Sequence, residues 1–199
     1  MKPIETTLPG VMLLYPPRFD DARGTFRPIF ATRLHELASH SWAEMNMSVT
    51  ARGVIRGLHF QHPRGQAKLI TVISGTIFDV VVDLRPGPSF LKHITVTLSA
   101  DDPSHPSQIY IPEGLAHGLA TPHESATITY LVSQPWSPED EHVIAYDDPT
   151  LAIAWPLPNP ILSDRDRLGE LIENFTNLQS PVFSLATLKK KIGASDKHH

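Results

Sequence analysis

One stretch of the chain combines side chains suited to proton transfer and to anion binding. It reads Arg52-Gly53-Val54-Ile55-Arg56-Gly57-Leu58-His59-Phe60-Gln61. An imidazole can accept a proton near neutral pH, and a guanidinium can bind two phosphate oxygens at once. In a regular strand Arg56 and His59 would lie on opposite faces, because successive side chains alternate. A β-bulge at Gly57 would turn both toward the same space.

Four further candidates are far apart in the sequence: Lys68, His117, Tyr130 and Asp166. We interpret Ile111-Pro112-Glu113-Gly114-Leu115-Ala116-His117-Gly118 as a turn that holds one histidine beside glycines. Lys68 begins an expected strand, Tyr130 lies within another, and Asp166 lies near an expected helix start. These side chains supply a cation, an acid and a carboxylate if the fold brings them together.

Each candidate also has an ordinary structural explanation. An isolated histidine is more often a hydrogen-bonded structural residue, and a lysine at a strand start is usually solvated. A strand tyrosine such as Tyr130 usually packs in a core, and a lone Arg56 would usually pair with a surface carboxylate. Ser163-x-x-Asp166 has the spacing of a helix capping box, with Asp in place of the usual Glu. Only a joint arrangement would indicate a functional site.

The elements that would position these residues are mainly strands. Two β-branched runs, 67–73 and 76–84, are joined by Ser74-Gly75 and predict a hairpin. Alternation with period two predicts further strands over 93–98, 108–111, 127–132 and 141–146. Short strands separated by Pro, Gly and Asp turns favour a sandwich, a barrel or a jelly roll.

Helical patterns are confined to the flanks of this region. We expect a short helix over 32–38 and another over 163–172, where Ser163 is the N-cap candidate. We expect a single domain over 1–175 and a loosely ordered tail over 176–199, which contains Lys189-Lys190-Lys191.

Composition excludes several classes of protein. The chain has 199 residues, 41% of them hydrophobic and 19% charged, which fits one globular domain and neither a disordered chain nor a coiled coil. A net charge of -4 argues against nucleic acid or an anionic membrane as a partner. The sequence contains no cysteine, which removes disulfides, thiol nucleophiles and thiolate metal sites. We find no apolar run of the roughly 20 residues that span a bilayer and no signal-peptide pattern, and therefore expect a cytoplasmic protein.

Four motifs occur in an order that points to a known family. Besides the stretches around His59 and His117, they are Phe78-Asp79-Val80-Val81-Val82-Asp83-Leu84-Arg85 and Pro160-Ile161-Leu162-Ser163-Asp164-Arg165-Asp166. From about Glu5 to Arg167 the chain resembles the dTDP-4-dehydrorhamnose 3,5-epimerase family. The resemblance implies an all-β, cupin-type jelly roll with short flanking helices, and a homodimer that exchanges N-terminal strands. It also implies an enzyme without metal or redox cofactor, acting on a nucleoside-diphosphate 4-keto-6-deoxyhexose.

The resemblance also implies roles for individual residues. His59 would be the base and Asp166 its partner, while Tyr130 would donate a proton from the opposite face of the sugar. Lys68, with His117 nearby, would stabilise negative charge on the carbonyl oxygen. The implied substrate-binding residues are Arg23, Phe26, Glu44, Asn46, Arg56, His117 and Trp136.

The chain departs from the family pattern at four positions. Pro28 stands where Glu is usual, Glu44 where Gln is usual, Trp136 where Tyr is common and Arg165 where Lys is usual. In the family, Pro28 and Glu44 would belong to the region that binds the nucleotide or the sugar, so the identity of the nucleobase stays open. The proposed base, partner, acid and Lys all remain, which favours the same reaction type. Whether C3, C5 or both are inverted stays open as well.

Three rival interpretations remain. A metal-dependent cupin could use His59, His62 and His117, but the His-x-His pair usual for that class is absent. A non-catalytic binding module for nucleotide sugars is the second, and it would have no need for an acid and a base on opposite faces. The third is an epimerase that acts at a single carbon or on another nucleotide sugar.

Overall fold

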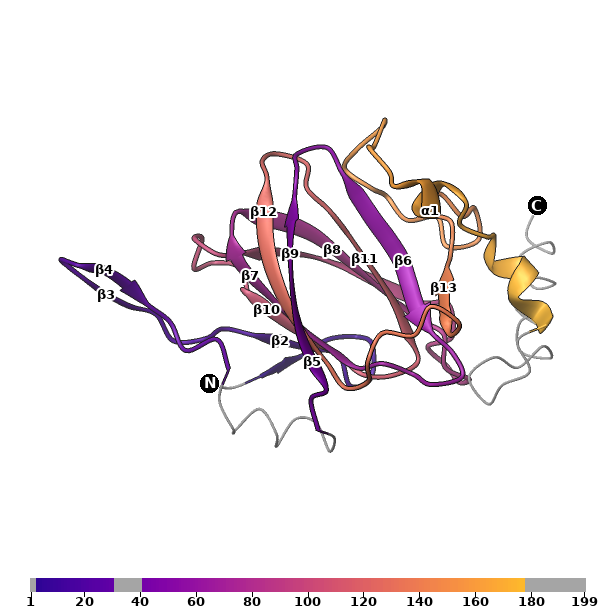
Figure 1. Ribbon diagram of the computed structural model, residues 1–199, viewed down its shortest axis with the longest axis horizontal. Helices are drawn as coiled ribbons and strands as arrows, with labels where there is room; N and C mark the ends of the chain where they lie inside the picture. Colours follow the sequence, from indigo (N-terminus) through magenta and orange to yellow (C-terminus); the bar gives the residue numbers. More distant parts are fainter. Residues whose placement is uncertain (1–2, 31–40, 178–199) are drawn as a thin grey trace.

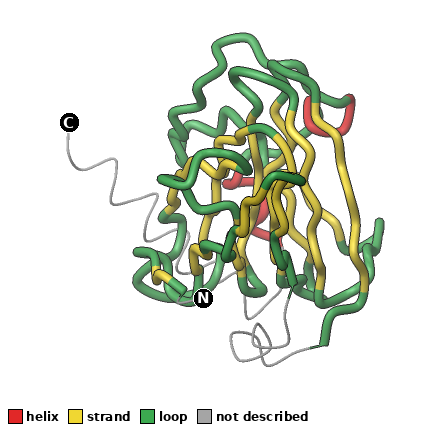
Figure 2. Tube along the Cα trace, turned by 90° about the vertical axis from the view of Figure 1, so that its left-hand side faces the viewer, coloured by secondary structure: helices red, strands yellow, loops and turns green. Residues whose placement is uncertain are grey.

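The computed structural model describes residues 3–30 and 41–177 (Figure 1). The helix expected over 32–38 and the tail from residue 178 onward lie outside these ranges. Figures 1 and 2 show a body built of strands, and Figure 1 shows the helical turns at its right-hand side. Within the described ranges, no helix has the length and apolar character needed to cross a membrane.

One layer of the body is a six-stranded antiparallel sheet. Its strand order is β1-β2-β10-β7-β12-β5. The bounds are β1 (Ile4–Glu5), β2 (Met12–Leu14), β10 (Gln108–Ile111), β7 (Lys68–Ser74), β12 (Ala126–Val132) and β5 (Glu44–Thr50). The strands expected over 67–73, 108–111 and 127–132 are confirmed here as β7, β10 and β12.

The other layer is a five-stranded antiparallel sheet with the order β13-β6-β11-β8-β9. It consists of β13 (Glu141–Val143), β6 (Ile55–Gln61), β11 (Leu115–Ala120), β8 (Thr76–Asp83) and β9 (His93–Ser99). A separate hairpin, β3 (Phe19–Asp21) and β4 (Gly24–Phe26), extends away from the body (Figure 1). The two packed sheets form an all-β jelly roll, as the resemblance implies.

The main core lies between the two sheets. Every second residue of β7 and β8 faces it, including Ile70, Val72, Ile77 and Val81, and all four are buried. This is the arrangement that period-two alternation predicts, because it places one apolar face of each strand against the other sheet.

The five-stranded sheet is covered on its outer face too. Val80 and Val82 of β8 pack in a second cluster with Leu151 and Phe175 from the C-terminal part of the chain. A strand buried on both faces has no polar side, which explains the continuous apolar run Val80-Val81-Val82. The part of the chain that follows β13 therefore covers the outer face of the sheet that contains β6 and β11.

The predicted hairpin of β7 and β8 is wrong. The two strands belong to different sheets, and the turn at Gly75 carries the chain from one layer to the other. Gly75 has φ +78°, and a Cβ at this position would lie 2.5 Å from the carbonyl oxygen of Ser125. Alternation and a glycine turn are common to a hairpin and to such a corner, so the sequence pattern does not separate them.

The segment around His117 and the last predicted helix also differ from expectation. Leu115–Ala120 is the central strand β11, not a turn, so His117 lies within a sheet. Helix α1 covers only Asp164–Arg167, and a 3₁₀ helix follows at Ile172–Asn177. The helix is capped by Leu168, and the next residue, Gly169, packs so closely on Ala145 that a Cβ would be 2.9 Å from the Ala145 Cα. The predicted N-cap, Ser163, is confirmed.

Candidate active site

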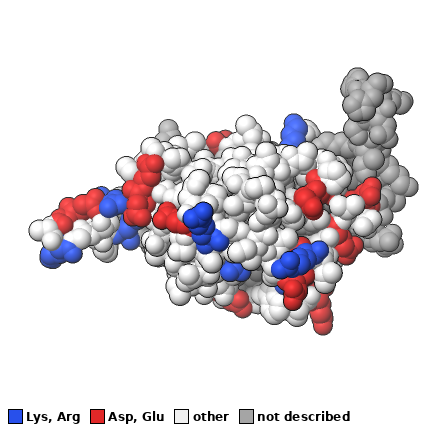
Figure 3. Space-filling model, turned by 90° about the horizontal axis from the view of Figure 1, so that it is seen from above, with Lys and Arg blue, Asp and Glu red and all other residues white. Residues whose placement is uncertain are grey.

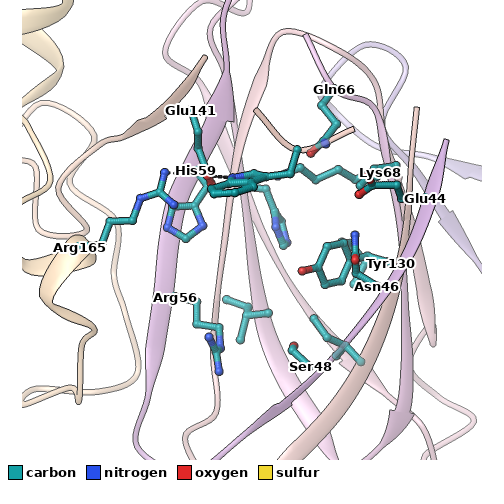
Figure 4. A pocket seen from close by; sticks show the side chains of 16 residues that line it. Glu44, Asn46, Ser48, Arg56, His59, Gln66, Lys68, Tyr130, Glu141 and Arg165 are labelled. Carbon is teal, nitrogen blue, oxygen red and sulfur yellow. Dashed lines mark hydrogen bonds and ion pairs between the residues drawn. The ribbon is translucent and has the colours of Figure 1, made fainter. Parts of the chain in front are cut away.

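A pocket of about 590 Å³ lies between the two sheets (Figure 4). Inward-facing residues of β5, β7 and β12 meet those of β6, β11 and β13 across it. The lining contains eight residues predicted from the sequence, which are Glu44, Asn46, Arg56, His59, Lys68, His117, Tyr130 and Trp136. The fold thus brings together side chains that are up to 92 positions apart, from Glu44 to Trp136.

The His59 side chain is hydrogen-bonded to a carboxylate, that of Asp166, on the side away from the pocket. Its Nε2 lies 2.6 Å from Oδ1 of Asp166, which is nearly buried, whereas the His59 side chain is 27% exposed toward the pocket. Because Nε2 is occupied, Nδ1 is the ring nitrogen left for a ligand. A carboxylate in this position orients the ring and stabilises the imidazolium once a proton has been taken up.

Asp166 is held firmly in this position by α1. The Ser163 hydroxyl donates to Asp166 Oδ2 at 2.7 Å and accepts from the Asp166 backbone N–H at 3.1 Å, while the Gly57 N–H donates to Oδ1 at 3.3 Å. Burial would raise the pKa of Asp166, but the hydrogen bonds from His59 and Ser163 outweigh it and lower that pKa. The capping interpretation and the catalytic interpretation of Asp166 are therefore compatible.

A bulge in β6 turns Arg56 and His59 into the same pocket. His59 lies opposite His117, yet Arg56 lies opposite Leu119, so the register shifts between them. Gly57 occupies the shift with φ +105°, and a Cβ there would lie 2.6 Å from the His117 carbonyl oxygen. The bulge expected at Gly57 is confirmed, and the close approach of β11 explains why this residue is a glycine.

Lys68 and Tyr130 face the pocket from the opposite sheet. Figure 4 shows the Tyr130 hydroxyl pointing into the cavity, across from His59. Burial raises the pKa of the Tyr130 phenol; the charges of Glu141 and Glu44 add to this and Arg56 opposes it. Burial lowers the pKa of Lys68, while Glu141 and Asp79 oppose that change. The Tyr130 phenol thus keeps its proton more firmly than usual, and the Lys68 ammonium group gives up a proton more readily than usual.

A second histidine–aspartate pair lies beside the first. His117 Nε2 is 2.7 Å from Oδ2 of Asp79, whose side chain is fully buried. His117 and His59 are direct partners across β11 and β6. The pocket therefore presents two imidazoles on one wall and a phenol with an ammonium group on the other.

Three residues form a network at the side of the pocket. Glu141 Oε2 accepts from the Trp136 indole N–H, and it also pairs with Arg165 Nη2 at 2.7 Å. Trp136 is 55% exposed, so its ring is open to a ligand for stacking. Arg165 supplies a second guanidinium besides Arg56.

Comparison with known proteins identifies the family. The model of the dTDP-4-dehydrorhamnose 3,5-epimerase family matches residues 5–174. The chain belongs to this family. The family member of that name from Mycobacterium tuberculosis H37Rv is 41% identical over 182 residues, covering 87% of this chain and 89% of its own length. A Neisseria gonorrhoeae member is 40% identical, and this chain spans about half, 51%, of its length.

Two other epimerases bear on the substrate. A dTDP-4-dehydrorhamnose 3-epimerase of Streptomyces niveus is 40% identical, over 79% of this chain and 77% of that protein. The crystal structure of a 3,5-epimerase from Legionella pneumophila, in complex with dTDP-4-keto-L-rhamnose, superposes with a TM-score of 0.81. It is 36% identical and covers 86% of this chain and 93% of its own.

Two residues expected in the epimerase site lie outside the pocket of their own chain. Arg23 and Phe26 are on the β3–β4 hairpin, where the Arg23 side chain is 90% exposed and pairs with Asp21. Phe26 is 67% exposed and stacks on Phe19 with ring centroids 6.2 Å apart. Figure 3 shows the hairpin projecting from the body with acidic and basic side chains next to each other.

Sequence reasoning gave no role to several residues that line the pocket. Ser48 and Gln66 line it, and Glu141 joins Trp136 to Arg165. Arg165 was noted only as a departure from the family pattern. Ser48 had a detectable signal, since it follows Glu44 and Asn46 at spacings of two on one strand.

The metal-site alternative finds no geometric support in the described residues. Within 3–30 and 41–177, no three His, Asp or Glu side chains gather in a group that could hold a metal ion. His62 does not line the pocket, and His59 and His117 each use Nε2 for an aspartate.

Proposed function

We propose that this chain is an epimerase that inverts C3, C5 or both in a nucleoside-diphosphate 4-keto-6-deoxyhexose, with dTDP-4-dehydro-6-deoxyglucose as the substrate we favour. It would act through an enolate and without a cofactor. One observation carries this proposal: the His59–Asp166 pair faces the Tyr130 phenol across a pocket that Lys68 also lines. Simple binding requires no base and acid on opposite walls.

The first step would be proton abstraction by His59. The C4 ketone acidifies the C–H bonds on C3 and C5, because the electron pair left behind delocalises onto the carbonyl oxygen. The C–H bond breaks, its proton goes to Nδ1 of neutral His59, and Asp166 stabilises the resulting imidazolium. An unperturbed imidazole, with a pKa of about 6.5, is suited to this step near neutral pH.

The second step would be protonation of the enolate from the other side. Lys68 and His117 would stabilise the negative charge on the oxygen, which in a pocket with little water is a large contribution. The Tyr130 O–H would then donate its proton to the carbon, so the new C–H bond forms on the opposite face. Solvent returns a proton to the tyrosinate and removes one from His59.

The nucleotide would lie toward Arg56, Arg165 and Trp136. Guanidinium groups bind phosphate oxygens in pairs, and an exposed indole can stack on a base. Glu44 lines the same pocket with a carboxylate, whereas the usual glutamine could also donate hydrogen bonds. The identity of the nucleobase therefore has to be determined by direct binding measurements with different nucleotides.

A single-carbon epimerase is the second candidate function. The Streptomyces niveus relative, named a 3-epimerase, favours it, since it resembles this chain as closely as the Neisseria gonorrhoeae 3,5-epimerase does, at 40% identity. The chemistry at each carbon is the same, so the two functions differ only in whether the sugar is repositioned for a second exchange.

The experiment that separates these functions is incubation with dTDP-4-keto-6-deoxyglucose in heavy water, with NMR detection of deuterium in the sugar. We expect deuterium at C3 and C5. Label at one carbon selects the single-carbon epimerase. Binding without label at either carbon refutes an epimerase and favours a non-catalytic binding protein.

We also propose that two copies of the chain form a cytoplasmic homodimer in which each hairpin completes the partner's pocket. Arg23 and Phe26 are exposed on a projecting hairpin, although the family resemblance gives them substrate contacts. The outward face of β5 adds an apolar stripe, because Met45, Met47 and Val49 are between 56% and 68% exposed. Such a stripe on an edge strand would be covered by a second copy.

A further inference from the structure

Asp79 is a buried carboxylate for which the mechanism above has no use. It lies on β8 with 0% exposure, among apolar residues of the same inward face such as Ile77 and Val81. One oxygen, Oδ2, is 2.7 Å from His117 Nε2. The other, Oδ1, is buried and has no hydrogen-bond partner within the described part of the chain. An ionised carboxylate so placed is costly unless a positive charge compensates it.

Asp166 provides a contrast within the same pocket. Its carboxylate receives hydrogen bonds from the Ser163 hydroxyl and the Gly57 N–H in addition to its contact with His59. Those donors stabilise its negative charge whether or not His59 is protonated. Asp79 has His117 alone, so its charge depends on a proton held by that ring.

We propose that Asp79 is a positioning residue that keeps His117 doubly protonated, so that Nδ1–H of His117 donates a hydrogen bond to the sugar carbonyl oxygen as it becomes negative. The pocket would then contain one neutral imidazole, His59, which accepts a proton, and one charged imidazole, His117, which stabilises an oxyanion. This inference rests on the proposed function for the identity of the oxygen. The protonation of His117 is independent of it.

The remaining charges around the pair agree with this assignment. The groups that face it are Arg56 and His59 from β6, Lys68 from β7, Tyr130 from β12, Glu141 from β13 and Glu44 from β5. On its far side, β9 places Val96 beside Asp79, which adds no charge. Glu141 is held by Arg165 and by the Trp136 indole, whereas Asp79 is hydrogen-bonded to His117. Asp79 also raises the pKa of Lys68, against the effect of burial. With Asp79 negative and with Lys68 and His117 both positive, these three groups carry a net charge of +1. The negative charge of an enolate oxygen would neutralise it.

The direct test is ¹⁵N NMR of histidine-labelled protein without substrate at pH 7.5, with His59→Gln and His117→Gln variants used to assign the signals. We expect both ring nitrogens of His117 to be protonated and only one ring nitrogen of His59. A neutral His117 at this pH overturns the proposal. Because no substrate is added, this result does not depend on whether the chain is an epimerase.

Asp79→Asn tests the consequence for turnover. An amide oxygen can still hold the His117 Nε2–H, but the ring is then neutral and its Nδ1 presents a lone pair to the oxyanion. Removing one such donor typically costs about 100-fold in turnover. For Asp79→Asn we expect the rate of deuterium exchange to fall by this factor at pH 8. The loss should be smaller at pH 6, where the His117 ring of the variant can be protonated. KM should change by a smaller factor than the turnover rate.

Asp83→Asn is the matched control. Asp83 lies on the same strand, is equally buried and is bonded to Arg85 and Ser89, outside the pocket lining. We expect this variant to be less stable but to exchange deuterium at the wild-type rate per folded molecule. Equal pH profiles for wild type and Asp79→Asn overturn the proposal. If Asp79→Asn does not fold, the NMR result on the wild type decides.

Discussion

His59 and His117 lie opposite each other on β6 and β11, and each is bonded through Nε2 to an aspartate. The difference between them comes from what else binds the carboxylate: Ser163 and Gly57 support Asp166, whereas Asp79 has no second donor among the described residues. At the scale of single residues, the proposed role of each histidine therefore depends on the hydrogen-bond donors that its aspartate has. Residue type alone gives the same expectation for both rings.

His59→Ala removes the proposed base at this scale. We expect deuterium exchange to fall by about a thousandfold, because a general base contributes between about 10² and 10⁴ in rate. The affinity for dTDP, measured by calorimetry, should remain close to that of the wild type. His123→Ala, an exposed histidine outside the pocket lining, is the control and should exchange normally. Exchange retained in His59→Ala would remove His59 from this role.

The sequence, together with the family resemblance, was sufficient to propose most of the individual site residues. Eight of the proposed residues line the pocket, and Asp166 lies directly behind one of them. Glu141 was missed because a glutamate at a strand start has no distinguishing pattern, and its function follows from contacts with Trp136 and Arg165. Arg23 and Phe26 lie on the β3–β4 hairpin outside the pocket of their own chain, so their predicted substrate contacts depend on the proposed homodimer.

At the scale of elements, the bulge in β6 brings Arg56 and His59 into the same pocket. Without the register shift at Gly57, strand alternation would send Arg56 and His59 to opposite faces. The sequence could predict this bulge, since two functional side chains with a glycine between them required it. It could not predict that β7 and β8 belong to different sheets or that Leu115–Ala120 is a strand. Pairing partners and strands that contain glycine depend on tertiary packing.

Gly57→Ala tests the bulge. The added Cβ would lie 2.6 Å from the His117 carbonyl oxygen and 2.8 Å from the Gly118 Cα, on a backbone with φ +105°. We expect the free energy of unfolding to fall by about 3 kcal/mol and exchange activity to fall with it. Gly87→Ala is the control, because Gly87 also has positive φ, at +144°, but open space around it. Equal stability losses in chemical denaturation would contradict the close approach.

At the scale of the whole molecule, the body of one chain contains the chemical groups of the site, while the hairpin lies apart from it (Figure 1). The exposed Phe19 and Phe26 on the hairpin, and Met47 on β5, are consistent with surfaces that a second copy would cover. If the hairpin completes the partner's pocket, an intact site requires two chains.

Mixing two inactive variants tests this arrangement. Arg23→Ala lacks the hairpin cation, and His59→Ala lacks the base. In a mixed dimer with exchanged hairpins, the Arg23→Ala chain keeps its own His59 and receives Arg23 from its partner, so one site is complete. We expect an equimolar mixture, refolded together, to regain about a quarter of wild-type activity, as random pairing in a two-fold dimer requires. No recovery from a mixture that sedimentation shows to be dimeric would contradict the exchange.

The central claim is that His59 and Tyr130 act on opposite faces of one sugar ring. The most direct test is Tyr130→Phe with dTDP-4-keto-6-deoxyglucose in heavy water, with deuterium incorporation and inverted product measured in the same sample by NMR. The account predicts that deuterium still enters the sugar, because His59 can remove and return a proton on its own side, while inverted product falls about 100-fold or more. Inverted product formed at the wild-type rate would contradict it.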